Sequence, residues 1–190
     1  DYYQCATCAL VFVPSEQHLT AAAEKAEYDQ HQNSPQDTGY RRFLGRLFNP
    51  LATKLAPGAR GLDFGCGPGP TLSVMFEEAG FDIDVYDIFY APHAANLTRQ
   101  YDFITATEVV EHLAAPGEVL SQRVAQLNHG GYLGLMTKRV TSQEAFVRWH
   151  YINDPTHVSF FSEATFRWWA AEQGLTVEFT GNDVVIFRKH

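Results

Sequence analysis

The stretch GLDFGCGPGP, residues 61–70, has the residue types and spacing of a loop that binds an anionic or nucleotide ligand. Gly65, Gly67 and Gly69 alternate with other residues just after a short apolar run that contains Asp63. Glycines let a backbone approach a ligand closely and adopt conformations that other residues avoid. A helix is predicted next, and its free N–H groups and dipole attract anions. The alternative is a tight strand-to-helix connection that binds nothing.

Two common nucleotide-binding patterns do not fit this loop. Dinucleotide-binding enzymes use G-x-G-x-x-G, but the sixth position counted from Gly65 is Pro70. A P-loop needs Gly-Lys followed by Ser or Thr, and no such sequence follows. The remaining pattern is D-x-G-x-G, with Asp63 at the end of a strand.

The rest of the chain predicts the elements that would position this loop. Strands and helices alternate after residue 60, with strands expected at 61–64, 81–87, 101–109 and 130–137 and helices at 70–80, 117–128 and 162–174. A hairpin with its turn at Gly181–Asn182 is expected to close the chain. The alternation predicts an α/β fold with a mostly parallel sheet, helices on both faces and an antiparallel edge strand.

The first 58 residues are predicted to form an appendage. Residues 1–14 contain a Cys-x-x-Cys pair and a β-like run, and 15–58 form a helical linker or lid. Its helices are expected at 15–28, with Ser15 as N-cap, and at about 40–55, with a polar loop between them. Residues 59–190 then make up the main domain.

Four motifs together resemble class I S-adenosylmethionine (SAM)-dependent methyltransferases, which have a Rossmann-like fold. DFGCGPG (63–69) resembles the first motif of that family, and YDFITATEVVEHL (101–113) resembles its fourth-strand motif. LNHGGYLGLMT (127–137) is similar to the turn before strand five, and the final hairpin to the reversed last strand. The resemblance covers residues 60–190 and predicts methyl transfer from SAM, with S-adenosylhomocysteine (SAH) as product.

The resemblance also implies which residues bind the cofactor. Asp87 ends the second strand 24 residues after Asp63, where a carboxylate can accept hydrogen bonds from both ribose hydroxyls. An aspartate at a strand end can equally be a turn former. Tyr28 and His31, in the lid segment 27–40, can face the cofactor, although capping or surface roles are the alternative. The predicted cofactor-binding residues are Asp63, Gly65, Cys66, Gly67, Gly69, Asp87, Thr107, Glu108, His112 and Tyr28.

One region departs from the family pattern. Only 13 residues separate Asp87 from Tyr101, where the family fits a helix, a strand and another turn. The third strand or its preceding helix is therefore expected to be shortened or lost. No adenine partner is assigned for this reason.

Catalytic candidates lie outside the glycine loop. A sulfonium methyl group is already activated, so the protein must align the acceptor and exclude water, and a base is needed only when the acceptor loses a proton. RWHYINDPTHVSFFS (148–162) is rich in aromatic residues and histidine and follows strand five. His157 and His150 are the predicted bases, with Tyr151 and Asp154 as acceptor-binding candidates. Alternatively, the histidines satisfy turn carbonyls and the aromatic residues anchor the loop.

Cys5 and Cys8 resemble half of a zinc ribbon, as in bacterial methyltransferases with an N-terminal Cys-x-x-Cys ribbon, some of which methylate sugars. Structural zinc needs four ligands, so a second pair is expected upstream of Asp1. A redox Cys-x-x-Cys is the alternative, but the helix it requires does not follow. The three cysteines are too few for a disulfide framework, which indicates the cytoplasm.

The overall composition limits the classes of partner that the protein is expected to bind. The net charge is −8 with scattered Lys and Arg, which disfavours nucleic acid, and no apolar stretch is long enough to span a membrane. The predicted function is therefore SAM-dependent transfer of a methyl group to a small-molecule acceptor by in-line displacement. A non-catalytic SAM-binding scaffold or sensor is the alternative, and an NAD-dependent oxidoreductase is a weaker one.

Overall fold

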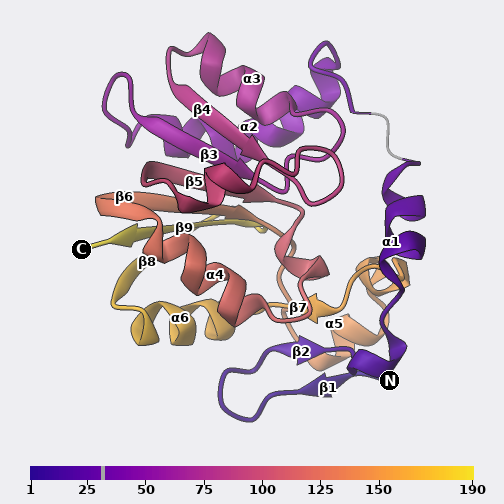
Figure 1. Cartoon of the computed structure of the whole chain (residues 1–190). Helices are drawn as coiled ribbons and strands as arrows, with labels where there is room; N and C mark the ends of the chain where they lie inside the picture. Colours follow the sequence, from indigo (N-terminus) through magenta and orange to yellow (C-terminus); the bar gives the residue numbers. More distant parts are fainter. Residues whose placement is uncertain (31–32) are drawn as a thin grey trace.

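In the computed structural model, which describes residues 1–30 and 33–190, the chain is organised around a six-stranded sheet (Figure 1). The strand order is β4-β3-β5-β6-β9-β8. The first four strands are parallel, whereas β9 pairs antiparallel with both β6 and β8. The strands are β3 (Arg60–Phe64), β4 (Asp82–Tyr86), β5 (Tyr101–Thr107), β6 (Leu127–Met136), β8 (Leu175–Thr180) and β9 (Val184–Lys189). The predicted fold class and closing hairpin are confirmed.

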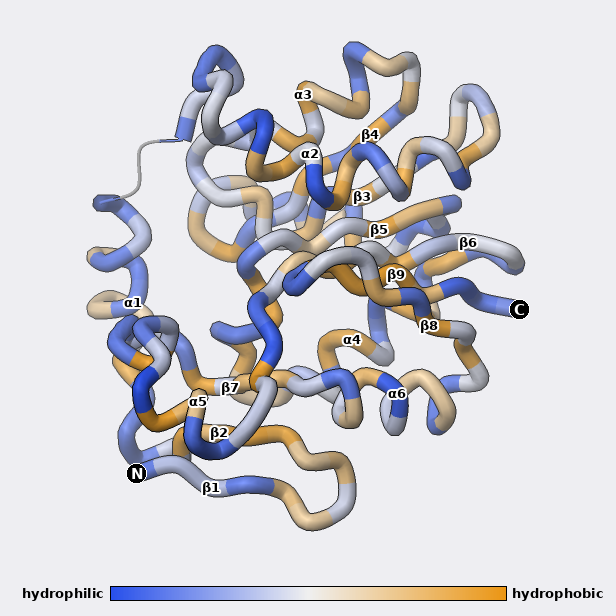
Figure 2. Tube along the Cα trace, turned by 180° about the vertical axis from the view of Figure 1, so that it is seen from behind, coloured by the Kyte–Doolittle hydropathy of each residue, from blue (hydrophilic) through white to orange (hydrophobic). Residues whose placement is uncertain are grey.

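Helices cover both faces of the sheet because its strands are apolar on both sides. Successive residues of β9 point to opposite faces. Val184 and Ile186 pack in one core with helices α2 (Thr38–Ala52) and α3 (Thr71–Glu78). Val185 and Phe187 pack in the other core with α4 (Pro116–Ala125) and α6 (Glu163–Glu172). Figure 2 shows the hydrophobic colouring along the inner strands and hydrophilic residues on the surrounding loops.

The N-terminal helix begins later than predicted. Ser15 does not cap an α-helix: it opens a short 3-10 turn, η1 (Ser15–Gln17), and His18 is extended. The α-helix α1 spans Ala21–Tyr28, and Thr20 caps it by accepting a hydrogen bond from the Ala23 N–H. The second helix, α2, has Asp37 as its N-cap. The predicted division of the chain at residues 14 and 58 stays a prediction.

A second small sheet joins the N-terminus to the 148–162 segment, which the sequence did not predict. It consists of β1 (Tyr3–Gln4), β2 (Val11–Phe12) and β7 (Ser159–Phe160), all antiparallel. Val11, Phe146, Tyr151 and Phe160 pack together beneath it. Helix α5 (Gln143–Val147) and the 3-10 turn η4 (His150–Asn153) lie between β6 and β7. This packing anchors the segment that carries His157.

The expected loss after β4 is present. Between β4 and β5 the described chain has only a bridge between Asp87 and Ala91 and the 3-10 turn η2 (Ala94–Thr98), so β4 forms the sheet edge. The 3-10 turn η3 (Val110–His112) follows β5. No helix among the described residues combines the length and apolar character required to cross a membrane.

Candidate active site

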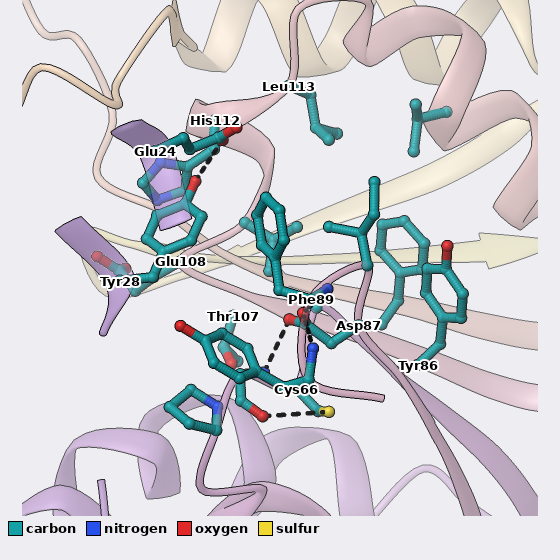
Figure 3. A pocket seen from close by; sticks show the side chains of 18 of the residues that line it. Glu24, Tyr28, Cys66, Tyr86, Asp87, Phe89, Thr107, Glu108, His112 and Leu113 are labelled. Carbon is teal, nitrogen blue, oxygen red and sulfur yellow. Dashed lines mark hydrogen bonds between the residues drawn. The ribbon is translucent and has the colours of Figure 1, made fainter. Parts of the chain in front are cut away.

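A pocket of about 630 Å³ opens at the carboxyl ends of β3, β4 and β5. This edge is where open parallel sheets bind their ligands. Further lining residues come from helices α1, α2 and α4, from the turns after β4 and β5, and from Asp154 and His157. Figure 3 shows Glu24, Tyr28 and His112 together at one end and Tyr86 at the other, with Asp87 and Phe89 between them.

The three glycines of the loop are required for different reasons. Gly65 has φ +75°, and a Cβ there would lie 2.4 Å from the Val109 side chain. A Cβ on Gly69 would lie 2.2 Å from the carbonyl oxygen of Asn33. Gly67 has φ +63°, and a Cβ there would meet nothing within 4 Å. Gly65 and Gly67 line the pocket, whereas Gly69 makes room for the protein's own chain. Only at Gly67 does the missing side chain leave open space.

Asp63 supports the loop from behind. The side chain is buried outside the pocket lining, and one of its oxygens accepts a hydrogen bond from the Thr105 hydroxyl at 2.9 Å. Burial raises the pKa of Asp63 to about 7. The structure therefore places Asp63 beneath the loop.

Asp87 joins the glycine loop to the turn after β4. Its carboxylate accepts the N–H of Gly67 at 3.0 Å, that of Phe89 at 2.8 Å and that of Tyr90 at 3.0 Å. The side chain also lines the pocket. A carboxylate has about four lone-pair positions, so these three bonds leave about one for a ligand hydroxyl. The turn-former and ligand-binding roles are therefore compatible at this residue.

Cys66, Thr107 and Glu108 line the middle of the pocket. Burial raises the pKa of the Cys66 thiol to about 12, so it stays protonated. Glu108 has φ +51°, a conformation that non-glycine residues rarely adopt and that clusters at functional sites. Its N–H donates to the carbonyl oxygen of Met136 at 2.7 Å, and burial raises the pKa of its carboxyl group.

Helix α1 brings Tyr28 to the pocket. The hydroxyl of Tyr28 donates to Glu24 at 2.6 Å, and its ring lies edge-on to His112 with centroids 5.2 Å apart. Both Tyr28 and Glu24 line the pocket. Glu24 was not predicted, although its spacing of four residues from Tyr28 on a helix was an available signal. His31 lies outside the described residues.

Two of the predicted residues meet at the Tyr28 end. The His112 and His157 rings have centroids 4.8 Å apart, and both residues line the pocket with Asp154. Nδ1 of His157 lies 2.7 Å from the carbonyl oxygen of Tyr151, and its Nε2 lies 3.7 Å from Asp154. Burial lowers the pKa of His157, which favours the neutral imidazole. We call this end of the pocket, formed by Tyr28, His112, Asp154 and His157, the histidine end.

The other predicted base lies elsewhere. His150 is exposed and its Nε2 is 2.9 Å from Lys138 Nζ; it is not among the residues that line the pocket. Tyr151 is buried and donates its hydroxyl to Glu111. The structure therefore brings His157, but not His150, to the described pocket.

The opposite end of the pocket is an apolar recess that the sequence did not predict. The rings of Phe64 and Tyr86 stack with their centroids 5.6 Å apart, and Leu113 and Val119 also line the pocket. Arg123 of α4 is 4% exposed, and its guanidinium lies 4.7 Å from the centre of the Phe64 ring. Leu97, from the short segment after β4, also lines the pocket.

Cys5 and Cys8 lie in the β1–β2 connection as free thiols. Among the described residues, no further His, Cys, Asp or Glu joins them in a group suited to a metal ion. The predicted zinc ribbon is therefore not confirmed.

A family model described as a methyltransferase domain matches residues 36–179. The chain belongs to this family. The match includes the glycine loop, Asp87, His112 and His157, and it confirms the prediction of a methyltransferase. A search of curated protein sequences gives no match.

Solved methyltransferases share the fold of this family member. A SAM-dependent methyltransferase from Archaeoglobus fulgidus superimposes with a TM-score of 0.62 at 18% identity, covering 79% of this chain and 94% of that one. Magnesium protoporphyrin IX methyltransferase from Synechocystis, with bound SAH, superimposes with a TM-score of 0.60 at 17% identity, covering 80% of this chain and 84% of that one. The plantazolicin methyltransferase in complex with SAH superimposes with a TM-score of 0.57 at 17% identity, covering 89% of this chain and 90% of that one. The Rossmann-like fold is thereby confirmed.

Proposed function

We propose that the pocket binds SAM and that the protein transfers its methyl group to a small molecule held at the histidine end. The observation that carries the proposal is the bond between Gly67 and Asp87, which places an open backbone position and a carboxylate side by side in the pocket. Two of the similar structures, from other methyltransferases, contain SAH. The family membership favours an enzyme over a scaffold or sensor.

The proposed cofactor orientation follows from the chemistry of the two ends. Asp87 would accept one ribose hydroxyl in addition to its three backbone N–H groups, and the backbone around Gly65 and Gly67 would receive the methionine part. The adenine would extend towards the apolar recess, where Phe64 and Tyr86 present flat apolar surfaces. The sulfonium would then lie near Thr107 and Glu108, with its methyl group directed towards the histidine end.

The acceptor class is inferred from the size and charge of the histidine end. Tyr28, His112, Asp154 and His157 offer hydrogen-bonding groups to a small polar acceptor inside a pocket of about 630 Å³. The net charge of −8 also disfavours a nucleic-acid acceptor. The base role of His157 and that of His150 stay predictions.

The test is calorimetric titration of the purified protein with SAH, with NAD as the control ligand. We expect micromolar SAH binding and none for NAD. A screen of small hydroxyl, amine and carbon acceptors with SAM would follow, with SAH release as the readout. Failure of a folded protein to bind SAH contradicts the proposal; binding of SAH without turnover of any acceptor would favour a sensor.

A further inference from the structure

Glu111 is a buried carboxyl group that the methyltransferase reaction leaves unexplained. Its side chain is 0% exposed, and one oxygen accepts the hydroxyl of Tyr151. The other oxygen, Oε2, has no hydrogen-bond partner among the described residues. A buried carboxylate oxygen without a partner is costly, so a water, a ligand or an ion is expected to serve as its partner.

Two histidines lie beside this carboxyl group. One carboxylate oxygen of Glu111 and one ring nitrogen each of His112 and His157 lie within 4.8 Å of one another. Two imidazoles and one carboxylate are a common ligand set for divalent ions from manganese to zinc. The three residues come from η3 and from the segment before β7, which the small N-terminal sheet anchors.

Both rings are oriented as metal-bound histidines are. Nδ1 of His112 lies 3.2 Å from the carbonyl oxygen of Thr156, and Nδ1 of His157 lies 2.7 Å from that of Tyr151. An Nδ1–H bonded to a carbonyl fixes the tautomer in which Nε2 carries the lone pair that a metal ion binds. The arrangement therefore provides the outer hydrogen bonds of a metal site as well as its ligands.

The surrounding charges favour a cation. Glu108 lies beside Glu111, because the hydroxyl of Tyr151 is within hydrogen-bond distance of a carboxylate oxygen of each. Asp154 lies 3.7 Å from His157 on the pocket side. Lys138 is the nearby positive charge, and its Nζ lies over the Tyr151 ring at 5.3 Å. A divalent ion would offset the remaining negative charge.

We propose that Glu111, His112 and His157 bind one divalent transition-metal ion, whose open positions take oxygen atoms of the methyl acceptor. The ion would lower the pKa of an acceptor hydroxyl, so His157 would act on the acceptor as a metal ligand and not as the base itself. The acceptor contact rests on the proposed function, whereas ion binding does not.

The test uses Co²⁺, whose visible absorption reports its ligands. The full chain carries Cys5→Ser and Cys8→Ser, because those thiols would otherwise compete for the ion. Equilibrium dialysis should give one Co²⁺ per chain. Glu111→Gln and His157→Gln should each weaken binding at least tenfold, whereas His129→Ala, an exposed histidine on β6, should not. Catechol, as an oxygen-donor probe, should shift the Co²⁺ spectrum if open positions exist.

Each outcome bears on one part of the proposal. Absence of Co²⁺ binding in protein that is folded by circular dichroism, or binding that neither substitution weakens, overturns the ion site. If Glu111→Gln does not fold, His157→Gln decides alone. Co²⁺ binding without a catechol shift overturns the acceptor contact. SAH titration of the same samples tests the proposed function independently. If the protein binds Co²⁺ but not SAH, the ion site stands and the proposed function fails. If it binds SAH but not Co²⁺, the proposed function stands and the ion site fails.

Discussion

The two ends of the pocket are built in different ways. At the part of the pocket proposed to bind the cofactor, which we call the cofactor end, Gly67 and Asp87 lie 20 residues apart, just beyond the adjacent parallel strands β3 and β4. The Gly67 N–H donates a hydrogen bond to the Asp87 carboxylate. At the histidine end, His112 contacts Thr156 across 44 residues, and Tyr28 comes from a helix before the main sheet. The first end depends on local turn geometry and the second on tertiary packing. Substitutions should therefore separate cofactor binding from methyl transfer.

The largest expected effect is at the histidine end. His157→Gln removes the ring that faces the pocket, whether it acts as a base or as a metal ligand. We expect kcat to fall by about 1000-fold, within the range for loss of acid–base or metal assistance, while the Kd for SAH changes less than twofold. Single-turnover methylation of an acceptor from the screen measures this. A parallel loss of SAH affinity would contradict the separation of the two ends.

The next effect is at the cofactor end. Asp87→Ala removes the acceptor of three backbone N–H groups and the proposed ribose ligand. We expect the Kd for SAH to rise about 100-fold, equivalent to about 2.7 kcal/mol. Asp82→Ala, an exposed carboxylate on the same strand, is the control. If Asp87→Ala is unstable, Asp87→Asn keeps the size of the side chain and tests the loss of the carboxylate. Unchanged SAH affinity in both variants would show that Asp87 does not bind the cofactor.

A smaller effect should distinguish the open glycine from an ordinary turn glycine. Gly67→Ala and Gly80→Ala both place a side chain at positive φ with nothing within 4 Å. Each should lose roughly 1 kcal/mol of stability. Only Gly67→Ala should weaken SAH binding, by about tenfold, because its methyl group enters the pocket. Thermal unfolding with and without SAH measures both quantities, and equal SAH affinity in the two variants would mean that Gly67 does not approach the ligand.

The smallest effect on the pocket concerns Asp63. Its pKa is raised to about 7, so the folded protein holds a proton that the unfolded chain releases near its ordinary pKa of about 4. The stability linked to this proton is fully present below pH 4 and is lost as the pH rises through 7. Asp63→Asn keeps the Thr105 contact. The fall in Tm with rising pH should be smaller in this variant by a few degrees. Its SAH affinity should stay within twofold of that of the unmodified protein. A decline as steep as in the unmodified protein would show that Asp63 does not cause it.

The sequence predicted the main sheet and the glycine-rich turn after β3 well because both follow from local rules. Alternating apolar runs predicted the main strands, and the glycine spacing together with Asp87 predicted the loop. The prediction that a helix begins at Ser15 was wrong because Pro14 and His18 keep the backbone extended around a short 3-10 turn. The β1–β2–β7 sheet was missed because its strands are two residues long and because β7 pairs with β2, which lies near the other end of the chain.

The sequence by itself determined the strand-to-helix loop, the carboxylate at the end of β4 and the shortening of the segment between β4 and β5, since each depends on residue type and spacing within a short segment. Only the tertiary structure decided that His157 and not His150 reaches the described pocket, that Gly69 serves internal packing, and that Glu111 lies beside two histidines. Those outcomes depend on contacts between segments tens of residues apart, which no local periodicity encodes.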